Sequence, residues 1–352
     1  MKPIDYNDIH RKNVAKYERQ VRRYYNQAID EIIGISYRLN LNSNGEFFFR
    51  NYTSVNKKVN KILEELYSNV YSGIVDGVNN EWQLAVDEHD KIALQIYGKK
   101  LAELPAQIKA DYLSTNGAAR RAFLARTNSE GLKLSDNIWK LTKDFKQQLE
   151  LSLEVGIGKG RSAAALSRDV RVYLNDPDKL FRRVRDENGV LRLSKAARNY
   201  SPGRGKYRSS YKNALRLTRN ETNFAYESSK KEKREKQDFI VAIDIKVSPN
   251  HNPSDDKGGI SCISLQGRYS KDFDFTRKWH TNCFCGSFNV LKTVEELDAD
   301  LENMLNGGNP ILSNKSKNAV NELPKNFTNY AKENKDKFAN WKRQPYWLDN
   351  IK

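Results

Sequence analysis

Apolar and aromatic residues recur every three or four positions along much of the first 130 residues. The first stripe, between residues 6 and 33, consists of Val14, Tyr17, Val21, Tyr24, Tyr25, Ala28 and Ile32. The second stripe has the same spacing and consists of Val55, Val59, Ile62, Leu63, Leu66, Val70 and Ile74. This spacing is typical of amphipathic helices. We therefore expect a helical region over residues 1–134, in which no chemical motif is recognisable.

Serine and glycine divide the following stretch into two further helices. Ser135 and Ser162 each precede an apolar stripe, and serine is a favoured N-cap residue. Between them, Gly156, Gly158 and Gly160 end the first of these helices. The glycines do not indicate a phosphate-binding loop, because no strand precedes them and the Gly-Lys-Ser/Thr order is missing.

Strand patterns appear only in the second half of the chain. Residues 181–193 place the pair Asn188-Gly189 between two short alternating arms, which predicts a β-hairpin. A long helix is expected over 209–237. Apolar residues then alternate with period two over 239–247, which predicts a strand, and residues 286–291 form a second strand candidate.

The C-terminal tail begins with a Gly- and Pro-containing linker at residues 306–310. An aromatic stripe follows on a short basic helix, which Pro345 must end. The stripe consists of Phe327, Tyr330, Ala331, Lys335, Phe338 and Trp341. Its helical period favours packing in a core, or docking on a partner, over a ligand site. The expected fold is mainly α, with a helical N-terminal region, a small α+β domain carrying a short sheet, and a helical tail.

The composition argues against a membrane protein. Mean hydropathy is −0.80, and no run approaches the ~20 consecutive apolar residues that span a bilayer. The N-terminus also lacks the apolar segment of a secretory signal. We expect a soluble protein made in a cytoplasm, where cysteines stay as thiols or metal ligands.

The charge of the chain is strongly positive and unevenly distributed. Formal net charge is +17 over 352 residues, and residues 177–236 carry 18 Lys and Arg against 7 Asp and Glu. Such a segment is typical of contact with the phosphates of nucleic acid, although a solvated helix face would show the same charge. The candidate contact residues are Arg182, Arg183, Arg185, Arg204, Lys206, Arg208, Lys212, Arg216 and Arg219.

Every cysteine lies within 24 positions, together with one histidine. Cys262, His280, Cys283 and Cys285 offer four ligands of the kind that suits a closed, tetrahedral zinc site. The Cys-x-Cys pair is tighter than the usual Cys-x2-Cys knuckle, so a folding motif without metal is the alternative. An enzyme with Cys283 or Cys285 as nucleophile and His280 as base is less favoured, because no oxyanion donor or acidic partner is recognisable.

These residues, with a motif on the preceding helix, resemble the phage Mu protein F-like family of minor head proteins, in the version found in phages and prophages of Bacteroidetes. The resemblance rests on Arg219-Asn220-Glu221-Thr222-Asn223, on Cys262-x-x-Leu265-x-Gly267, and on Trp279-His280-x-x-Cys283-x-Cys285. It covers the chain from about residue 135 to the end, where Pro345 to Asn350 also match. The sequence departs from the pattern at Gly259, Thr281 and Phe284, where relatives have Cys, Pro and Arg. These departures favour a structural role over catalysis.

The resemblance implies a non-enzymatic component of the virion, at the portal vertex or inside the capsid, made in the bacterial host's cytoplasm. It would act in head morphogenesis, and in DNA packaging or ejection. Residues 1–134 would dock on the portal or major capsid protein, 135–292 would form the Mu F-like domain, and 293–352 the helical tail. Packaged double-stranded DNA is a further expected partner, and a DNA-binding module of the virion is the alternative role.

Overall fold

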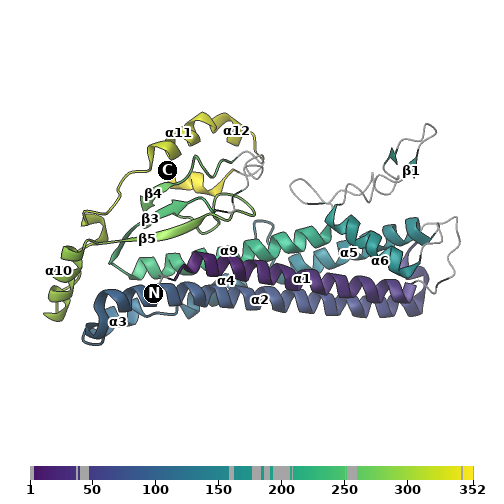
Figure 1. Ribbon diagram of the computed structural model, residues 1–352, viewed down its shortest axis with the longest axis horizontal. Coiled ribbons are helices and arrows are strands. Elements are labelled where there is room, and N and C mark those ends of the chain that lie inside the picture. Colours follow the sequence, from purple (N-terminus) through teal and green to yellow (C-terminus); the bar gives the residue numbers. More distant parts are fainter. Residues whose placement is uncertain are drawn as a thin grey trace. The chain divides into compact units, whose positions relative to one another are not determined.

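The computed structural model describes residues 4–36, 39, 47–157, 162–176, 184–185, 191–192, 207, 209–249, 251, 260–341 and 344–351. These residues are mainly helical and include a small antiparallel sheet, which confirms the expected fold class (Figure 1). The helices are α1 (Tyr6–Ser36), α2 (Thr53–Tyr97), α3 (Ala106–Tyr112), α4 (Gly117–Ala125), α5 (Leu134–Ile157), α6 (Ala163–Asn175), α9 (Ser210–Lys236), α10 (Val294–Leu305), α11 (Lys325–Glu333) and α12 (Lys335–Ala339). The strands are β1 (Val184–Arg185), β2 (Leu191–Arg192), β3 (Ile240–Lys246), β4 (Gly267–Ser270) and β5 (Gly286–Leu291).

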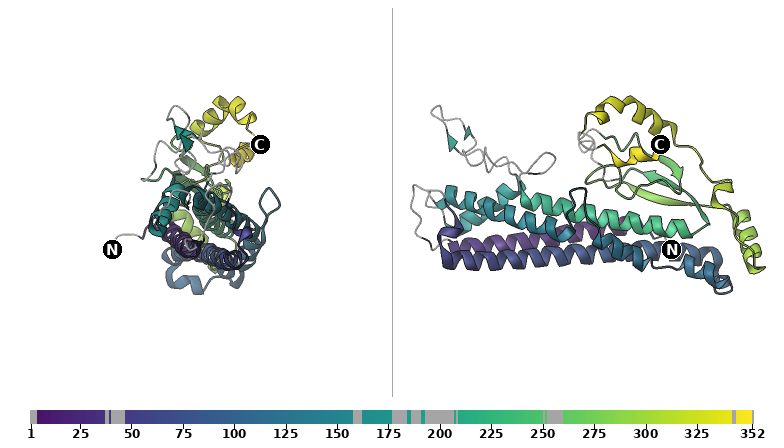
Figure 2. Two further views of the ribbon diagram at one scale, coloured as in Figure 1. Left: turned by 90° about the vertical axis from the view of Figure 1, so that its right-hand side faces the viewer. Right: turned by 180° about the vertical axis from the view of Figure 1, so that it is seen from behind.

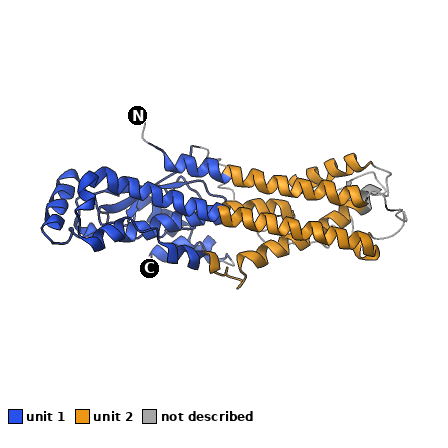
Figure 3. Ribbon diagram, turned by 90° about the horizontal axis from the view of Figure 1, so that it is seen from below, with its two compact units in different colours: residues 1–14, 77–123, 220–352 blue, residues 15–76, 124–219 orange. Residues whose placement is uncertain are grey.

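The chain divides into two compact units, each built from separate stretches of sequence (Figure 3). Unit 1 contains residues 1–14, 77–123 and 220–352, and unit 2 contains residues 15–76 and 124–219. The predicted boundaries at residues 134 and 292 do not coincide with this division. Long helices contribute residues to both units, and the tail shares a core with the cysteine segment, so no cut at one point of the sequence separates the units.

Unit 2 contains most of the predicted helix boundaries. Ser162 caps α6, since its side chain accepts a hydrogen bond from the backbone of Ala165 at 3.3 Å, as predicted. Ser135 instead lies inside the first turn of α5, and the carboxylate of Asp136 accepts the hydrogen bond from the Lys133 backbone at 2.9 Å. The β1–β2 pair confirms the predicted hairpin, while its Asn188-Gly189 turn lies outside the described residues.

Unit 1 contains a three-stranded antiparallel sheet with the order β4-β3-β5. The alternating pattern located β3 to within one residue at each end, and β5 has the predicted bounds. β4 was not predicted, because its four residues Gly-Arg-Tyr-Ser show no clear alternation. In Figures 1 and 2 the sheet lies between α11 and α12 on one side and the C-terminal part of α9 on the other.

Two apolar clusters cover the sheet of unit 1. Ile243 and Ile245 of β3 face a cluster that contains the three cysteines and the aromatic tail residues. Phe239 and Ile240 belong to a second cluster with Ala93 and neighbouring apolar residues of α2, α3 and α10. Because β3 contributes to both, it is buried along almost its whole length.

The tail packs as part of the core. Phe327 and Phe338 are buried, and Ala331 between them is nearly so. The predicted aromatic stripe therefore belongs to a core, as the helical period favoured, although it is divided between α11 and α12. None of the described helices is both long and apolar enough to cross a membrane.

Candidate metal centre

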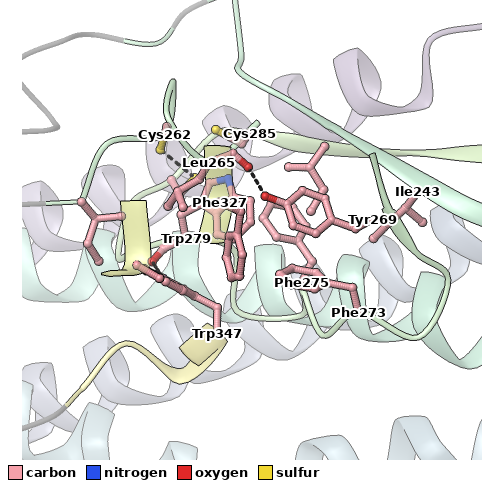
Figure 4. Close-up of a cluster of buried hydrophobic side chains, with 14 of the residues drawn as sticks. Ile243, Cys262, Leu265, Tyr269, Phe273, Phe275, Trp279, Cys285, Phe327 and Trp347 are labelled. Carbon is pink, nitrogen blue, oxygen red and sulfur yellow. Dashed lines mark hydrogen bonds between the residues drawn. The ribbon is translucent and has the colours of Figure 1, made fainter. Parts of the chain in front are cut away.

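The first ligand turn (Cys262–Leu265) lies between β3 and β4. It is closed by a hydrogen bond from the Leu265 backbone to the Cys262 carbonyl, at 3.3 Å. The hydroxyl of Tyr269 in β4 donates to the Leu265 carbonyl at 2.6 Å (Figure 4). The strand thus holds the turn and points Cys262 into the core.

The second ligand turn (residues 279–285) leads directly into β5. The Cys283 backbone donates to the His280 carbonyl at 3.2 Å, which closes the turn. Asn282 has φ of 65°, in the left-handed region that asparagine adopts more readily than most residues. Local backbone chemistry therefore forms the turn.

Three of the four predicted ligands, the cysteines, come together, and the fourth, His280, lies beside Cys262. The sulfur atoms of Cys262, Cys283 and Cys285 all lie within 4.8 Å of one another. The Sγ atoms of Cys262 and Cys283 are 3.7 Å apart, and Nε2 of His280 is 3.0 Å from Sγ of Cys262. Zn–S bonds of about 2.3 Å in a tetrahedron give an S–S edge of about 3.8 Å, so the Cys262–Cys283 separation already matches that geometry. This buried cysteine cluster could hold a metal ion.

In its neutral form, the imidazole of His280 presents an acceptor nitrogen to the cluster. Its Nδ1 lies 2.7 Å from the Thr281 carbonyl, and this contact requires that Nδ1 donate a proton. Nε2 is then the acceptor nitrogen, as a metal ligand must be. The Thr281 carbonyl thus selects the tautomer of the imidazole through its contact with Nδ1. Nε2 contacts Sγ of Cys262, which is not one of the two cysteines considered as a nucleophile.

The thiols share protons in a way that concentrates negative charge on one sulfur. Burial raises the pKa of Cys283, but hydrogen bonds from Cys262 and Cys285 and the nearby His280 and Lys278 outweigh it and hold that pKa well below its usual value. Hydrogen bonding to Cys283 and Cys285 raises the pKa of Cys262, and burial adds to this. A metal ion would displace the protons of the donating thiols, because thiolates are the ligands.

Aromatic residues surround the cluster on its inner side. Trp279 precedes His280 and is 1 % exposed, and its ring lies edge-on to that of Trp347 with centroids 6.1 Å apart. The indole of Trp347 donates to the Trp279 carbonyl at 3.1 Å (Figure 4). The cysteines are themselves 0 to 2 % exposed, so bulk water is excluded from them, and His280 is half-buried.

Two asparagines of α9 support the second ligand turn from outside. The side chain of Asn220 accepts a hydrogen bond from the Asn282 backbone at 3.1 Å. Asn223 donates from Nδ2 to the Cys283 carbonyl at 3.2 Å, and its Oδ1 lies 2.8 Å from Nε2 of His10. Sequence reasoning found Asn220 and Asn223 only as parts of a motif and missed His10, whose partner lies 213 positions away.

The other motif residues have structural roles in unit 1. Glu221 is half-buried on α9. Gly267 begins β4, and a Cβ there would lie 3.2 Å from Cγ of Pro324. Trp279 is a core residue.

The predicted nucleic-acid contacts are placed only in part. Arg182, Arg183, Arg204, Lys206 and Arg208 lie outside the described residues, and Arg185 is described only as a strand position. Lys212 and Arg216 are half-buried, with their charged ends 5.6 and 5.5 Å from the ring centroid of Tyr207. Arg219 is 2.6 Å from the carboxylate of Glu18.

The C-terminal half of α9 buries much of its positive charge. Lys230, Lys233 and Arg234 are 0 to 1 % exposed. Nζ of Lys230 lies 3.3 Å from Glu88, and Nζ of Lys233 lies 2.5 Å from Asp90. This part of the basic segment 177–236 faces acidic residues of unit 1, so it is a buried ionic network and not a surface for phosphates.

Comparison of the chain with models of known protein families, with the sequences of curated proteins and with solved structures finds no match.

Proposed function

We propose that Cys262, His280, Cys283 and Cys285 bind one zinc ion in a closed structural site. The observation that carries the proposal is the convergence of three cysteine sulfur atoms from two turns, with His280 beside Cys262, in a core that shields the sulfur atoms from water. Four protein ligands leave no open position for substrate, which is the arrangement of structural rather than catalytic zinc. His280 lies beside Cys262 and would supply the fourth ligand once its imidazole turns toward all three sulfur atoms.

The local charge also suits this metal. Three thiolates and Zn²⁺ together carry one net negative charge, and Lys278 is buried close enough to lower the pKa of Cys283. The ion would tie the first ligand turn to the start of β5, and binding free energy of this kind is also folding free energy.

Metal analysis tests the proposal directly. The full chain, purified without chelator, should carry one zinc per chain by native mass spectrometry. Cys283→Ser should lose the ion, and Thr281→Ala, which alters an exposed side chain inside the same turn, should keep it. A wild-type chain that stays free of divalent metal at micromolar zinc would overturn the proposal.

We further propose that the chain is a phage minor head protein with a non-enzymatic role in capsid morphogenesis. The resemblance that implies this rests on the residues that hold the ligand turns: the asparagines of α9, the glycine that begins β4, and the tryptophans of the core. A motif devoted to supporting one folded element is expected of an architectural protein. Partners of this role would be the portal or major capsid protein.

Purified heads test this role. The protein should be present in virions from an induced lysogen, with density at the portal vertex or on the inner capsid wall by cryo-electron microscopy. Its absence from complete, DNA-filled heads would contradict the proposal.

Contact with packaged DNA is a second proposal, restricted to the start of α9. Tyr207 is exposed, and Lys212 and Arg216 lie over its ring, a combination of cation and aromatic that suits non-specific phosphate and base contacts. The affinity of the chain for double-stranded DNA should fall steeply with salt, and Lys212→Ala with Arg216→Ala should reduce the slope by about 2. Binding that is absent at low salt would remove the DNA role and leave the head protein proposal intact.

A further inference from the structure

The N-terminal end of α1 is joined to the second ligand turn through a buried histidine. His10 is 2 % exposed and lies between Glu81 of α2 and Asn223 of α9. Nδ1 of His10 is 2.5 Å from the Glu81 carboxylate, and Nε2 is 2.8 Å from Oδ1 of Asn223. The histidine thus connects three helical segments of unit 1.

The hydrogen bonds of Asn223 fix the direction of this connection. The Cys283 carbonyl can only accept, so Nδ2 of Asn223 must face it and Oδ1 must face His10. Nε2 of His10 therefore carries a proton and donates it. Because Nδ1 contacts a carboxylate, a second proton is shared between His10 and Glu81, which makes this a charge-assisted pair.

Stacking holds the histidine in this orientation. The rings of His10 and Tyr226 are parallel to within 9°, with centroids 4.2 Å apart. The hydroxyl of Tyr226 donates to Glu88 at 2.7 Å, so the tyrosine is itself anchored. A ring held on its face and at both nitrogens has little freedom to turn, and it positions the amide that supports Cys283.

A second contact joins α1 to the two residues that follow the last ligand, Gly286 and Ser287. Nδ2 of Asn7 donates to the Ser287 carbonyl at 3.3 Å. A Cβ atom at Gly286 would lie 2.8 Å from Oδ1 of Asn7, closer than real Cβ contacts come. The first turn of α1 therefore packs directly on the backbone beside Cys285, and only glycine at position 286 leaves room for it.

We propose that residues 6–14 of α1 form a latch on the second ligand turn, so that docking of this helical end and metal binding stabilise each other. Asn7, His10 and Asn223 are positioning residues: Asn7 and Asn223 touch the backbone of Ser287 and Cys283, and His10 acts through Asn223. The inference rests on the proposed zinc site. Coupling of this kind is reciprocal: if docking strengthens metal binding, metal binding must strengthen docking by the same factor.

The first test compares two buried histidines. His10→Ala should weaken zinc binding roughly tenfold, measured by competition with a chromogenic chelator, because residues that orient metal ligands typically contribute 10- to 100-fold. His89→Ala is the matched control. His89 is also fully buried and hydrogen-bonded at 2.7 Å to a side-chain amide, that of Gln237 just after α9, but it reaches Asn289 in the middle of β5 and not the ligand turns.

The second test needs no variant and therefore does not depend on the folding of His10→Ala. Removal of zinc from the wild-type chain by chelator should speed amide hydrogen exchange in residues 6–14 by about tenfold, because linkage makes the effect of zinc on docking equal to the effect of docking on zinc affinity. Exchange in α10 should stay within a factor of two. Re-addition of zinc should restore protection.

The outcomes separate the latch from the site. If the wild-type chain binds no zinc, the proposed function fails. If it binds zinc, but His10→Ala and His89→Ala have the same zinc affinity and exchange in residues 6–14 ignores the metal, the site stands and the latch is overturned.

Discussion

Trp347 makes the C-terminal tail an integral part of unit 1. It is fully buried, its ring lies 5.4 Å from that of Phe327 and 5.6 Å from that of Phe338, and it packs edge-on against Trp279. Its indole also donates to the Trp279 carbonyl, one residue before a metal-ligand candidate. Truncation of this side chain is therefore expected to loosen the core beneath the ligand turns.

The cost can be estimated from the contacts. Replacement of a fully buried Trp by Ala costs about 3–5 kcal/mol, because packing is lost and a cavity remains. Trp347→Phe keeps most of the ring packing and loses the hydrogen bond, which is about 1 kcal/mol, or more if the Trp279 carbonyl stays without a donor. The two variants should therefore differ by about 2–4 kcal/mol.

Native-state hydrogen exchange of the β3 and β4 amides measures these effects locally. About 1.4 kcal/mol of lost stability corresponds to a factor of ten in the exchange rate. The slowest amides should therefore exchange about three orders of magnitude faster in Trp347→Ala, which loses about 4 kcal/mol, and about tenfold faster in Trp347→Phe. Trp139→Ala, at a 40 % exposed site of unit 2, should leave these amides unchanged. An effect of less than tenfold for Trp347→Ala would refute the assignment of the tail to this core.

Three further substitutions test buried charges of unit 1. Asp300→Ala removes the carboxylate that lies 2.6 Å from Nζ of buried Lys292, and should lower the free energy of unfolding by about 3–5 kcal/mol in urea titrations; a double change to Asp300→Leu with Lys292→Met should recover most of the loss, and a single variant as stable as wild type would contradict this. Arg234→Met should be neutral or stabilising by up to about 2 kcal/mol, because none of the Arg234 guanidinium nitrogens has a hydrogen-bond partner among the described residues; a large loss would show that the charge is compensated. Burial raises the pKa of Asp238, so its ionised form disfavours folding above that pKa. Asp238→Asn should raise the urea midpoint at pH 7, and this gain should vanish as the pH falls below about 4, near the pKa of an unfolded aspartate; an equal gain at both pH values would refute it.

Local sequence patterns were sufficient to predict elements whose conformation depends on neighbouring residues. The alternation in β3, the capping hydroxyl of Ser162 and the ends of β5 could all be predicted from neighbouring residues. The bounds of the compact units could not, because α1 and α2 continue through them without a break in helical pattern. β4 was missed because four residues are too few to show a period.

The ligand set could be predicted because three cysteines and a histidine are rare residues placed close together. The residues that hold the ligand turns in place could not be predicted. His10 and Glu81 each stand on a long helix among charged neighbours, where a solvated side chain is the ordinary expectation. The pairing of positions 10, 81 and 223 comes from tertiary packing. One local sign was available on α2: Glu81 and Glu88 are seven positions apart, on the same side of the helix, and this side is buried.

Unit 1 is built from three separate stretches of the chain, and this affects the order in which its parts can fold during synthesis. Asn7 finds its partner 280 positions later, and the core closes only when Trp347 is in place. Contacts between such distant positions form slowly, because the loop-closure entropy must be met before they stabilise anything. The first turn of α1 is therefore made early and stays undocked until the strand that contains Ser287 has been synthesised. A chain that ended before Trp347 would leave the aromatic core beneath the ligand turns incomplete.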